Sequence, residues 1–590
     1  MGLEAWLTLA VIVLLVVVLA RDRLAPAAAV FIAVVVLLLA GIIDSGQAFA
    51  GFANPAPMTV AALYVLARAV EKTGALQPVV NATLGAGTGA RAALARLLVP
   101  TAAASAFLNN TPIVAMLAPQ VEEWASRRGL SPSLFLMPVS FAAILGGVVT
   151  LIGTSTNLVV SGLLVANEMP PIGMFELTMI GLPVALIGVT AVVLLAPTVL
   201  PPRRAAREDL SDDVREFVVD MEVVAGGPLE GHSIEAGGLR HLQGVFLFQI
   251  DRDGEIVAPV GPEMVLRGGD RLRFVGRADL VVDLQRTRGL VTAERGHLPT
   301  FDPRRAAFFE AVIGPSSPLV GTSLREAGFR GRYQAAVLAI HRAGRRLEVK
   351  LGAVRLRVGD TLVLVSEPGF RDRWYDRRDF LLISRLGGSL PVSSRQGLLV
   401  GAIALGIVVA AGSGLLPILE ASLVGAGLLV LLGVLTPGEA RNAVDLDVII
   451  LIAASFGIGA AIESSGLAAV LASGLVDLGS GFGPVALLLG VVLATLALTE
   501  LITNNAAAVL IFPIALATAA GAGLDPRPFA IAIAIAASAS FMTPIGYQTN
   551  TMVYGMGGYR FGDFARVGFP LTILMLVVCT IFIPLSWPLR

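Results

Sequence analysis

Two short polar clusters interrupt long apolar stretches of the chain. The first, FLNNTP, places Asn109 and Asn110 at its centre, and the second, ITNN, ends in Asn504 and Asn505. Amide and hydroxyl oxygens are hard ligands that suit a small cation, and the free N–H groups of interrupted helices attract an anion. The clusters therefore predict the binding of small ions.

Each cluster is followed, at nearly the same distance, by a second interruption. Asn157 ends the sequence IGTSTN and lies 47 positions after Asn110, while Asn550 ends PIGYQTN and lies 46 positions after Asn504. A glycine precedes each final asparagine by four positions. Two matched spacings indicate a duplicated unit, since polar residues that only hold helices together need not repeat in this way.

The composition is that of a membrane protein with a soluble insert. Only 15% of the 590 residues are charged and 55% are hydrophobic, whereas an ordinary soluble domain has about 25% charged residues. Residues 201–394 hold 55 of the 86 charged residues, which predicts two membrane blocks on either side of this segment. A net charge of zero gives no field that favours nucleic acid, and the single cysteine, Cys579, excludes a disulfide framework.

Apolar runs of suitable length are expected to cross the membrane, because a hydrocarbon core of about 30 Å takes about 20 residues of helix. Arg21 and Arg23 follow the first run and place its end in the cytoplasm, so the N-terminus is expected outside. The runs lie near 4–20, 25–43, 57–71, 174–198, 395–416, 419–435 and 446–461.

Residues 92–121 are expected to form a re-entrant hairpin with FLNNTP at its tip, because basic residues on both sides keep its two ends in the cytoplasm. A second hairpin, within 481–518, is expected to enter from outside, since Arg560 and Arg566 place the end of the next run in the cytoplasm. The helices facing the hairpins are expected at 133–168 and 527–557, each broken in the middle.

With these features the chain resembles the divalent anion/sodium symporter family, whose members carry Ser-Asn-Thr motifs at two hairpin tips and glycine-containing breaks in the facing helices. The resemblance covers both membrane blocks. It implies an inverted-repeat secondary transporter that works as a homodimer by elevator-type alternating access. It implies sodium sites lined by Ser105, Asn109, Asn110 and Gly153, and by Thr499, Ile502, Asn504 and Gly546. It implies an anion site formed by Asn109, Asn110, Thr111, Thr154, Thr503, Asn504 and Asn505, with Tyr547 and Gln548 nearby.

The tips depart from the family pattern in ways that bear on the substrate. Asn109 and Asn505 stand where shorter side chains are usual, and Ser155 and Gln548 replace prolines. Longer amides shrink the cavity and add donors, which favours sulfate over a four-carbon dicarboxylate such as succinate, the alternative substrate. The pattern also resembles the family branch with a regulatory insert, whose algal members are regarded as sulfate carriers. The predicted pocket contains no Lys or Arg, so sodium ions are expected to supply the compensating charge.

Glu500, beside Thr499, and Glu463, at the end of an apolar run, give rise to competing hypotheses. A buried carboxylate could carry a proton, which would make the chain a proton-coupled anion carrier, or Glu500 could brace the hairpin. An ion channel gated by the insert is disfavoured by the absence of a TVGYG-like filter. An enzyme is not expected, because every histidine lies in the insert and no nucleophile–base–acid set occurs.

The insert is itself duplicated. PLEGHS (228–233) matches PLVGTS (318–323), and RGGDRLRFV (267–275) matches RVGDTLVLV (357–365), both with an offset of 90. Short alternating apolar runs between Gly and Asp turns predict strands. The modules resemble a tandem pair of the TrkA-C type of potassium-transport regulatory domain (the RCK C-terminal type). Two roles are consistent with this: binding of a small-molecule regulator, and dimer formation.

These observations predict a polytopic α-helical protein of the plasma (inner) membrane with a cytoplasmic α+β insert and both termini outside. Its expected partners are a small inorganic or dicarboxylate anion, Na+ and a second copy of the chain, and no nucleic acid. The expected domains are a membrane block at 1–199 with the inner hairpin, the insert at 200–394 with modules at about 210–290 and 300–375, and a membrane block at 395–590 with the outer hairpin.

Overall fold

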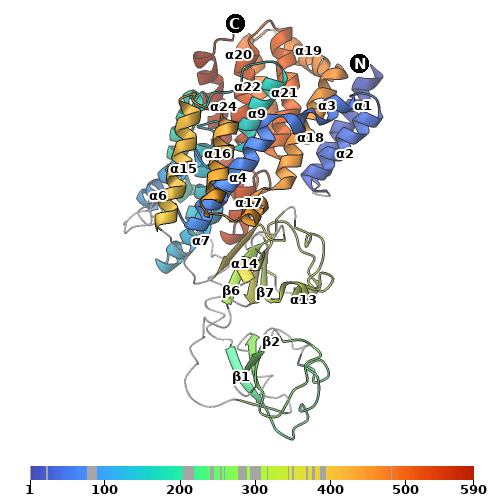
Figure 1. Ribbon diagram of the computed structural model, residues 1–590, viewed down its shortest axis with the longest axis vertical. Coiled ribbons are helices and arrows are strands. Elements are labelled where there is room, and N and C mark those ends of the chain that lie inside the picture. The colour runs from blue at the N-terminus through green and yellow to red at the C-terminus, as the bar shows by residue number, and fades with distance from the viewer. Residues whose placement is uncertain are drawn as a thin grey trace. The chain divides into compact units, whose positions relative to one another are not determined.

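The computed structural model divides the chain into two compact units, one helical and one containing the strands (Figure 1). The helical unit comprises Met1–Pro202, Ser389–Tyr554 and Tyr559–Arg590, and the other comprises Arg203–Gly388 and Gly555–Gly558. The structure describes residues 2–589 except 22–23, 76–89, 203–217, 240–244, 253–254, 258–259, 277–288, 293–306, 315–316, 343–344, 348–350, 367–369, 375–378, 386–393 and 480.

The first half of the helical unit follows the apolar runs of the sequence. Its helices begin at prolines or at capping side chains in several places; Asn54, for example, accepts a hydrogen bond from the backbone N–H of Ala56 at the start of α4. The described helices are α1 (Leu3–Ala20), α2 (Pro26–Leu39), α3 (Ser45–Phe49), η1 (Ala50–Ala53), α4 (Pro55–Thr73), α6 (Ala90–Ser105), α7 (Asn110–Arg127), α8 (Ser133–Gly147), α9 (Ser155–Ala166) and α10 (Thr178–Val199).

The second half has a similar succession of helices. Three of them, the short α17 together with α19 and α24, are not among the spans expected from the sequence. The described helices are α15 (Ser394–Gly412), α16 (Ile418–Leu431), α17 (Pro437–Ala443), α18 (Leu446–Ser464), α19 (Leu467–Gly479), α20 (Pro484–Thr499), α21 (Asn504–Gly521), α22 (Pro526–Ser538), α23 (Gln548–Met556) and α24 (Phe561–Ser586).

Several helices of the described part are long and apolar enough to cross a hydrocarbon core of about 30 Å. The broken helices are shorter: α8 has 15 residues and α9 has 12. The long candidates are Ser45–Thr73, Thr178–Val199, Arg395–Gly412, Leu446–Ser464, Asn504–Gly521 and Phe561–Ser586.

All four polar clusters of the sequence lie between consecutive helices. The pair α6–α7 is drawn towards the lower end of the helical unit and α20 towards its upper end (Figure 1). The tip before α7 leaves the helical conformation at Asn109, whose ψ angle is 142°. The tip before α21 does the same at Thr503, whose ψ angle is 148°. The interruptions lie between Ser105 and Asn110, Gly147 and Ser155, Thr499 and Asn504, and Ser538 and Gln548.

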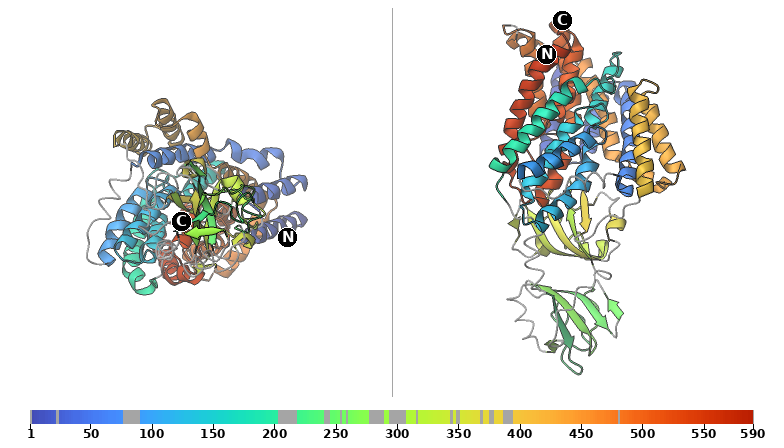
Figure 2. Two further views of the ribbon diagram at one scale, coloured as in Figure 1. Left: turned by 90° about the horizontal axis from the view of Figure 1, so that it is seen from below. Right: turned by 90° about the vertical axis from the view of Figure 1, so that its left-hand side faces the viewer.

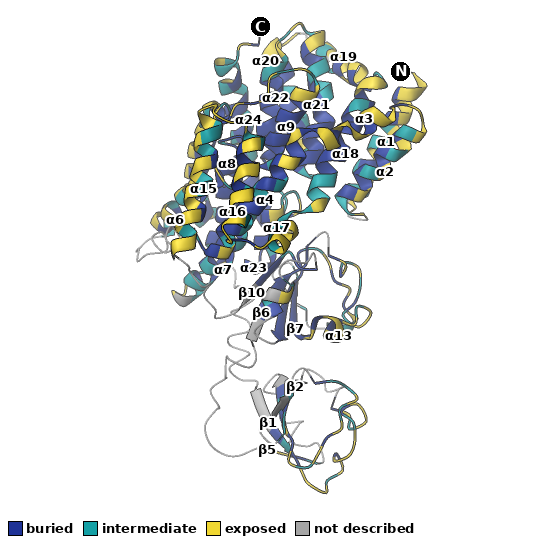
Figure 3. Ribbon diagram, in the orientation of Figure 1, coloured by how far each residue is buried: buried dark blue, intermediate teal, exposed yellow. Residues whose placement is uncertain are grey.

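Burial separates the helices that carry the interruptions from those at the periphery (Figure 3). Every residue of α8 except Leu134 is buried, whereas only 11% of the apolar window in α15 is buried inside the protein. Small residues allow the close packing, since a Cβ on Gly146 of α8 would lie 2.1 Å from the carbonyl oxygen of Ala102 in α6. The backbones of helices α6 and α8 are therefore in direct contact at this point.

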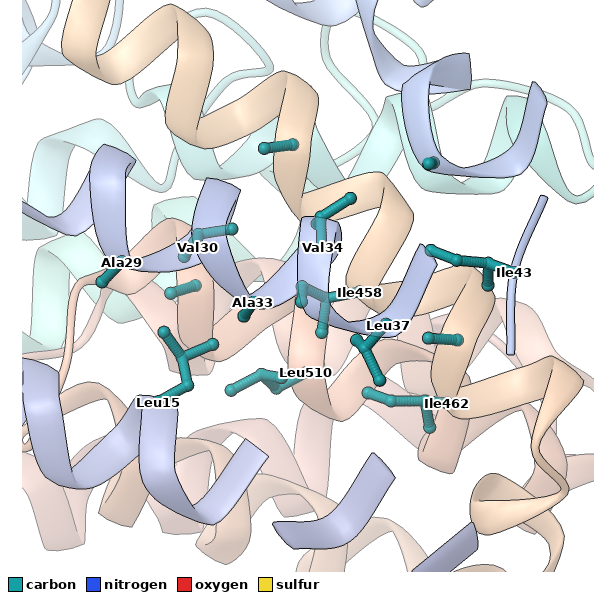
Figure 4. Close-up of a cluster of buried hydrophobic side chains, with 14 of the residues drawn as sticks. Leu15, Ala29, Val30, Ala33, Val34, Leu37, Ile43, Ile458, Ile462 and Leu510 are labelled. Atoms are coloured by element: carbon teal, nitrogen blue, oxygen red, sulfur yellow. The ribbon is translucent and has the colours of Figure 1, made fainter. Parts of the chain in front are cut away.

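Two apolar clusters hold the peripheral helices. Leu15 of α1, Val34 and Leu37 of α2, Ile458 of α18 and Leu510 of α21 belong to the first (Figure 4). The second joins α4 to α15 and α16, which lie together at one side of the helical unit (Figure 2, right). Elements from both halves of the sequence thus pack together in each cluster.

The described residues of the insert form two five-stranded antiparallel sheets, with strand orders β3-β2-β4-β1-β5 and β10-β6-β9-β7-β8. The alternating runs of the sequence form strands β2, β4, β7 and β9, and these two pairs carry the offset of 90 seen in the sequence. The strands are β1 (Val218–Val223), β2 (Val245–Arg252), β3 (Glu255–Val257), β4 (Arg271–Gly276), β5 (Leu290–Thr292), β6 (Ala307–Val312), β7 (Ala335–Arg342), β8 (Arg345–Arg346), β9 (Thr361–Ser366) and β10 (Leu382–Arg385). Two short helices, α13 (Phe329–Tyr333) and α14 (Phe370–Trp374), accompany the second sheet.

One buried ion pair recurs in both modules. Asp360 is fully buried and accepts hydrogen bonds from Nε and Nη2 of Arg342, both at 2.7 Å, and from the backbone N–H of Arg357 at 2.8 Å. Asp270 makes the same bonds to Arg252 in the first module. The hydrogen bonds to Asp360 raise the pKa of Arg342. The pair joins the end of one strand to the turn before the next.

Candidate ion-binding site

The four interruptions meet in the helical unit, where the tip before α7 and the tip before α21 each contact the later interruption in the other half of the chain. At the first tip, the amide of Asn110 lies 2.6 Å from the hydroxyl of Tyr547, and the Thr111 hydroxyl donates to Gln548 Oε1 at 3.3 Å. At the second tip, Asn505 Oδ1 accepts from Thr156 at 3.0 Å and lies 3.3 Å from Ser155 Oγ. Residues far apart in the sequence thus form one polar centre.

The cross contacts repeat between the two halves. Ser155 corresponds to Gln548, and Asn505 corresponds to Thr111, when the halves are aligned on their interruptions. The bond between Thr111 and Gln548 is therefore the counterpart of the contact between Ser155 and Asn505. The duplication noted in the sequence is also present in the hydrogen bonding.

A cluster of oxygen atoms surrounds the buried side chain of Asn110. Ser105 Oγ donates to Asn110 Oδ1 at 2.6 Å. The same end of the amide faces the carbonyl oxygens of Ala143 at 3.0 Å and Gly153 at 3.3 Å. When the amide oxygen faces inward, the cluster offers four oxygens to a small hard cation, and carbonyls at interrupted helices commonly coordinate Na+. When the amide nitrogen faces inward, it donates to the two carbonyls instead. Of the residues predicted for the first sodium site, Ser105, Asn110 and Gly153 are brought together here, and Asn109 lies at the adjoining helix start.

Glycine at position 147 leaves room for this cluster. A Cβ at Gly147 would lie 2.4 Å from Asn110 Oδ1, closer than two non-bonded atoms can approach. A side chain at Gly153 would likewise meet the carbonyl oxygen of Gly147 at 2.5 Å. The chain around Asn110 can close to this extent only because both positions lack a side chain.

The second cluster pairs Thr499 with Asn504 as the first pairs Ser105 with Asn110, but here the alanine carbonyl contacts the threonine hydroxyl instead of the amide. Thr499 Oγ1 lies 2.9 Å from Asn504 Oδ1 and 2.5 Å from the carbonyl oxygen of Ala537. Ser105 and Thr499, Asn110 and Asn504, and Ala143 and Ala537 are each separated by 394 positions. Of the other residues predicted for this site, buried Ile502 lies in the turn before Asn504, and the Gly546 N–H donates to Thr543.

Glu500 is tied to the second break. Its Oε1 accepts hydrogen bonds from the backbone N–H groups of Phe541 and Met542, both at 2.8 Å. This contact satisfies two donors at the end of α22 and fits a bracing role. Glu463, the other carboxylate named in the sequence, is exposed in the last turn of α18.

Asn157 and Asn550 hold the two breaks in shape. Asn157 Nδ2 donates to the carbonyl oxygens of Gly147 at 3.3 Å and Thr150 at 2.9 Å. Asn550 Nδ2 donates in the same way to Ser540 at 3.0 Å and Thr543 at 3.2 Å. These bonds satisfy carbonyls that the end of a helix leaves free.

Three helix N-termini at the centre lack a side-chain cap. The N-cap residues of α7, α9 and α21 are Asn109, Thr154 and Thr503, and none of their side chains accepts a hydrogen bond from the first turn. Elsewhere Asn54 and Asp445 do cap their helices. Uncapped N–H groups and the positive ends of the helix dipoles attract an anion. The Thr503 hydroxyl also has no hydrogen-bond partner.

Burial divides the predicted site residues into two groups. Ser105, Asn110, Thr499 and Asn504 are buried, as ligands of a desolvated cation would be. Thr154 and Asn505 of the predicted anion site are buried as well. Asn109, Thr111, Thr503 and Tyr547 are half-buried and Gln548 is exposed, so these side chains remain open to a ligand. None of the hydrogen bonds described here among the site residues involves a Lys or Arg side chain.

The carbonyls of Ala143 and Ala537 were not predicted from the sequence. A backbone carbonyl carries no signature of its own in a sequence, and alanine is common in these helices. The one available signal is spacing, because each alanine lies 33 positions after the corresponding asparagine.

Comparison with known proteins identifies the family of the chain. The model of the citrate transporter family CitMHS matches residues 13–536, with a second match at 421–588. The chain belongs to this family. It is therefore a secondary transporter of the membrane and not an enzyme. The match does not identify the insert, whose likeness to TrkA-C modules stays a prediction.

Individual relatives carry more specific names. The chain is 35% identical to a putative sulfur deprivation response regulator of Chlamydomonas reinhardtii, over 94% of this chain and 97% of that protein. It is 25% identical to probable sodium/sulfate cotransporter 3 of the same organism, over 91% and 83%. A sodium-dependent dicarboxylate transporter of Staphylococcus saprophyticus is 31% identical over 136 residues, 23% of this chain and 26% of that protein.

Proposed function

We propose that the chain is a sodium-coupled symporter of a divalent anion and that sulfate is its substrate. The observation that carries this proposal is the joint position of two oxygen clusters and three uncapped helix N-termini at one polar centre. The buried clusters would hold Na+, and the half-buried side chains and free N–H groups would hold the anion.

Charge balance supports sodium coupling. A doubly charged anion inside a membrane protein needs compensating charge, because an unpaired buried charge is very costly. Dipoles and amides reduce this cost only in part. Two cations, one on each side of the anion, would balance its charge.

The geometry favours a compact anion. Asn505 is hydrogen-bonded to Ser155 and Thr156, and Thr111 is hydrogen-bonded to Gln548. Because these contacts come from both halves, they leave little space for an anion between the tips. Sulfate has acceptor oxygens on all sides, so it can accept hydrogen bonds from amide, hydroxyl and backbone N–H donors that surround a small space. Relatives named as sodium/sulfate cotransporters agree with this assignment. The second candidate, a C4-dicarboxylate, is supported by the shorter match to a dicarboxylate transporter.

Movement of the site as one body is the transport mechanism that we infer. Each hairpin tip is hydrogen-bonded to the opposite broken helix, so the tips and breaks would move together past the peripheral helices in an elevator-type cycle. The inverted orientation of the halves, the cytoplasmic insert with a regulatory role, and a homodimer belong to the same proposal.

Uptake into liposomes tests the function. Purified full-length protein should accumulate labelled sulfate when a sodium gradient is directed inward, and not when potassium replaces sodium. Equal uptake in potassium, or uptake driven by a pH gradient alone, would rule out sodium coupling. Excess succinate should compete poorly, and strong competition by succinate would favour the dicarboxylate alternative.

A further inference from the structure

The Asn110 side chain connects the first oxygen cluster to the anion space through Tyr547. One end of the amide faces Ser105 Oγ and the carbonyl oxygens of Ala143 and Gly153. The other end lies 2.6 Å from the Tyr547 hydroxyl. That hydroxyl is also 3.3 Å from Oγ1 of Thr154, the N-cap residue of α9. The phenol thus lies between the buried cluster and the uncapped helix start.

The amide fits this place in two orientations. With the oxygen turned inward, Oδ1 accepts from Ser105 at 2.6 Å and Nδ2 donates to the Tyr547 oxygen at 2.6 Å. With the nitrogen turned inward, Nδ2 faces the Ala143 carbonyl at 3.0 Å and the Gly153 carbonyl at 3.3 Å, and Oδ1 accepts from the Tyr547 hydroxyl at 2.6 Å. The two states exchange donor and acceptor at both ends of the amide.

Occupancy of the cluster selects between the orientations. In an empty cluster the nitrogen-inward state is favoured, because it gives N–H donors to two carbonyls that otherwise face the amide oxygen. A cation in the cluster reverses this preference, since it is attracted to the amide oxygen and repelled by the N–H groups. Sodium binding would therefore turn the amide so that its oxygen points inward.

The turn of the amide changes what Tyr547 can do. A tyrosine hydroxyl has one hydrogen to donate. In the nitrogen-inward state that hydrogen is committed to Asn110 Oδ1. In the oxygen-inward state the phenol oxygen accepts from Asn110 Nδ2, and its hydrogen is free to point towards the anion space beside Thr154.

The geometry points to an amide–phenol relay in which sodium at the first cluster makes the Tyr547 hydroxyl available as a donor to the anion. This inference rests on the proposed function and adds a positioning residue that links one cation to the substrate. The second cluster has no such phenol, because Thr154 is the residue that corresponds to Tyr547 in the first half. Coupling through the relay therefore belongs to the first cation alone.

The test compares Tyr547→Phe with the wild type by binding of labelled sulfate to the purified full-length protein, with and without saturating sodium. A hydrogen bond to a charged group corresponds to roughly 10- to 100-fold in affinity. The substitution should weaken sulfate binding by about this factor in sodium and leave it unchanged without sodium. Sodium binding measured without sulfate should not weaken, because phenylalanine removes the donor that favours the nitrogen-inward state.

Tyr554→Phe is the matched control, since it removes a tyrosine hydroxyl on α23, the helix that begins directly after Tyr547, and the Tyr554 ring packs against Phe564. It should bind sulfate as the wild type does in sodium. A general packing defect in Tyr547→Phe would instead weaken sulfate binding equally with and without sodium, and that outcome would overturn the relay. Wild-type affinity of Tyr547→Phe in sodium would overturn it as well.

A double-mutant cycle gives an independent check. Ser105→Ala weakens the sodium cluster and should lower sodium-promoted sulfate binding. Adding Tyr547→Phe should then lower sulfate binding little further, because both residues act in the same sequence of contacts from the cation to the anion. Fully additive losses would contradict the relay. If the wild type showed no sodium-promoted sulfate binding, the proposed function would fail together with the relay, whereas a failure confined to the variants concerns the relay alone.

Discussion

Asparagine is the residue on which both halves of the site are built, because its amide can present an oxygen to a cation and N–H groups to an acceptor on opposite sides. The pairing of Asn110 with Ser105, and of Asn504 with Thr499, spans five positions across a helix interruption. Residue types and spacing were sufficient to single out these positions. The partners that lie across the halves, such as Tyr547 for Asn110, depend on the tertiary arrangement.

At the residue scale we expect Gly147→Ala to disturb the first cluster. The added Cβ would lie 2.4 Å from Asn110 Oδ1 and 2.9 Å from Nδ2, so the amide must shift. Overpacking of this kind costs about 1–3 kcal/mol, which predicts a higher half-saturating sodium concentration for sulfate uptake in proteoliposomes. Gly427→Ala in α16 is the control, because its Cβ would meet nothing within 4 Å. An unchanged sodium dependence in folded Gly147→Ala would contradict this account of the cluster.

At the scale of elements, the interruptions and the duplicated strands follow from local sequence. The apolar runs end at FLNNTP and ITNN because Asn and Thr favour helix starts, and the alternating runs of the insert form β2, β4, β7 and β9. Helices α19 and α24 were not among the expected spans, although Ser464–Gly466 and Gly557–Arg560 mark the residues where they begin. The hydrogen bonds from Asn157 and Asn550 to the carbonyls of the two interruptions could be identified only in the folded chain.

The recurring ion pair of the insert predicts a local loss of stability. Asp360→Asn removes the charge from the fully buried partner of Arg342. Because the Arg342 side chain is 24% exposed, the cost should lie between the about 0–1 kcal/mol of a surface pair and the about 3–5 kcal/mol of a wholly buried one. Limited proteolysis of the full chain should then cleave the second module faster. Glu326→Gln is the control, because the Glu326–Arg355 pair is 52% and 71% exposed and a surface pair contributes about 0–1 kcal/mol. Similar cleavage of both variants would be evidence against the bracing role of Asp360.

For the whole molecule, the charge distribution predicts orientation. Basic residues near the ends of the apolar runs predict that the insert lies in the cytoplasm and both termini outside. The single cysteine makes this testable, because Cys579 is buried and can be replaced by serine to give a background without thiols.

In that background, single cysteines report the topology. Gly2→Cys should react with a membrane-impermeant maleimide in intact cells, because Gly2 is exposed and is expected outside. Glu326→Cys should react only after the membrane is permeabilised, since Glu326 is exposed on the insert. Labelling of Glu326→Cys in intact cells would place the insert outside and reverse the proposed orientation.

The sequence by itself determined the membrane class, the two duplications and the positions of the polar interruptions, because hydrophobicity, turn chemistry and repeated spacing are local properties. Family membership added that the chain is a secondary transporter. Only the tertiary structure decided which interruption contacts which, that the carbonyls of Ala143 and Ala537 join the oxygen clusters, and that Tyr547 reaches Asn110 from the other half. Those contacts are made by backbone atoms or by side chains hundreds of positions apart, and neither leaves a pattern along the chain.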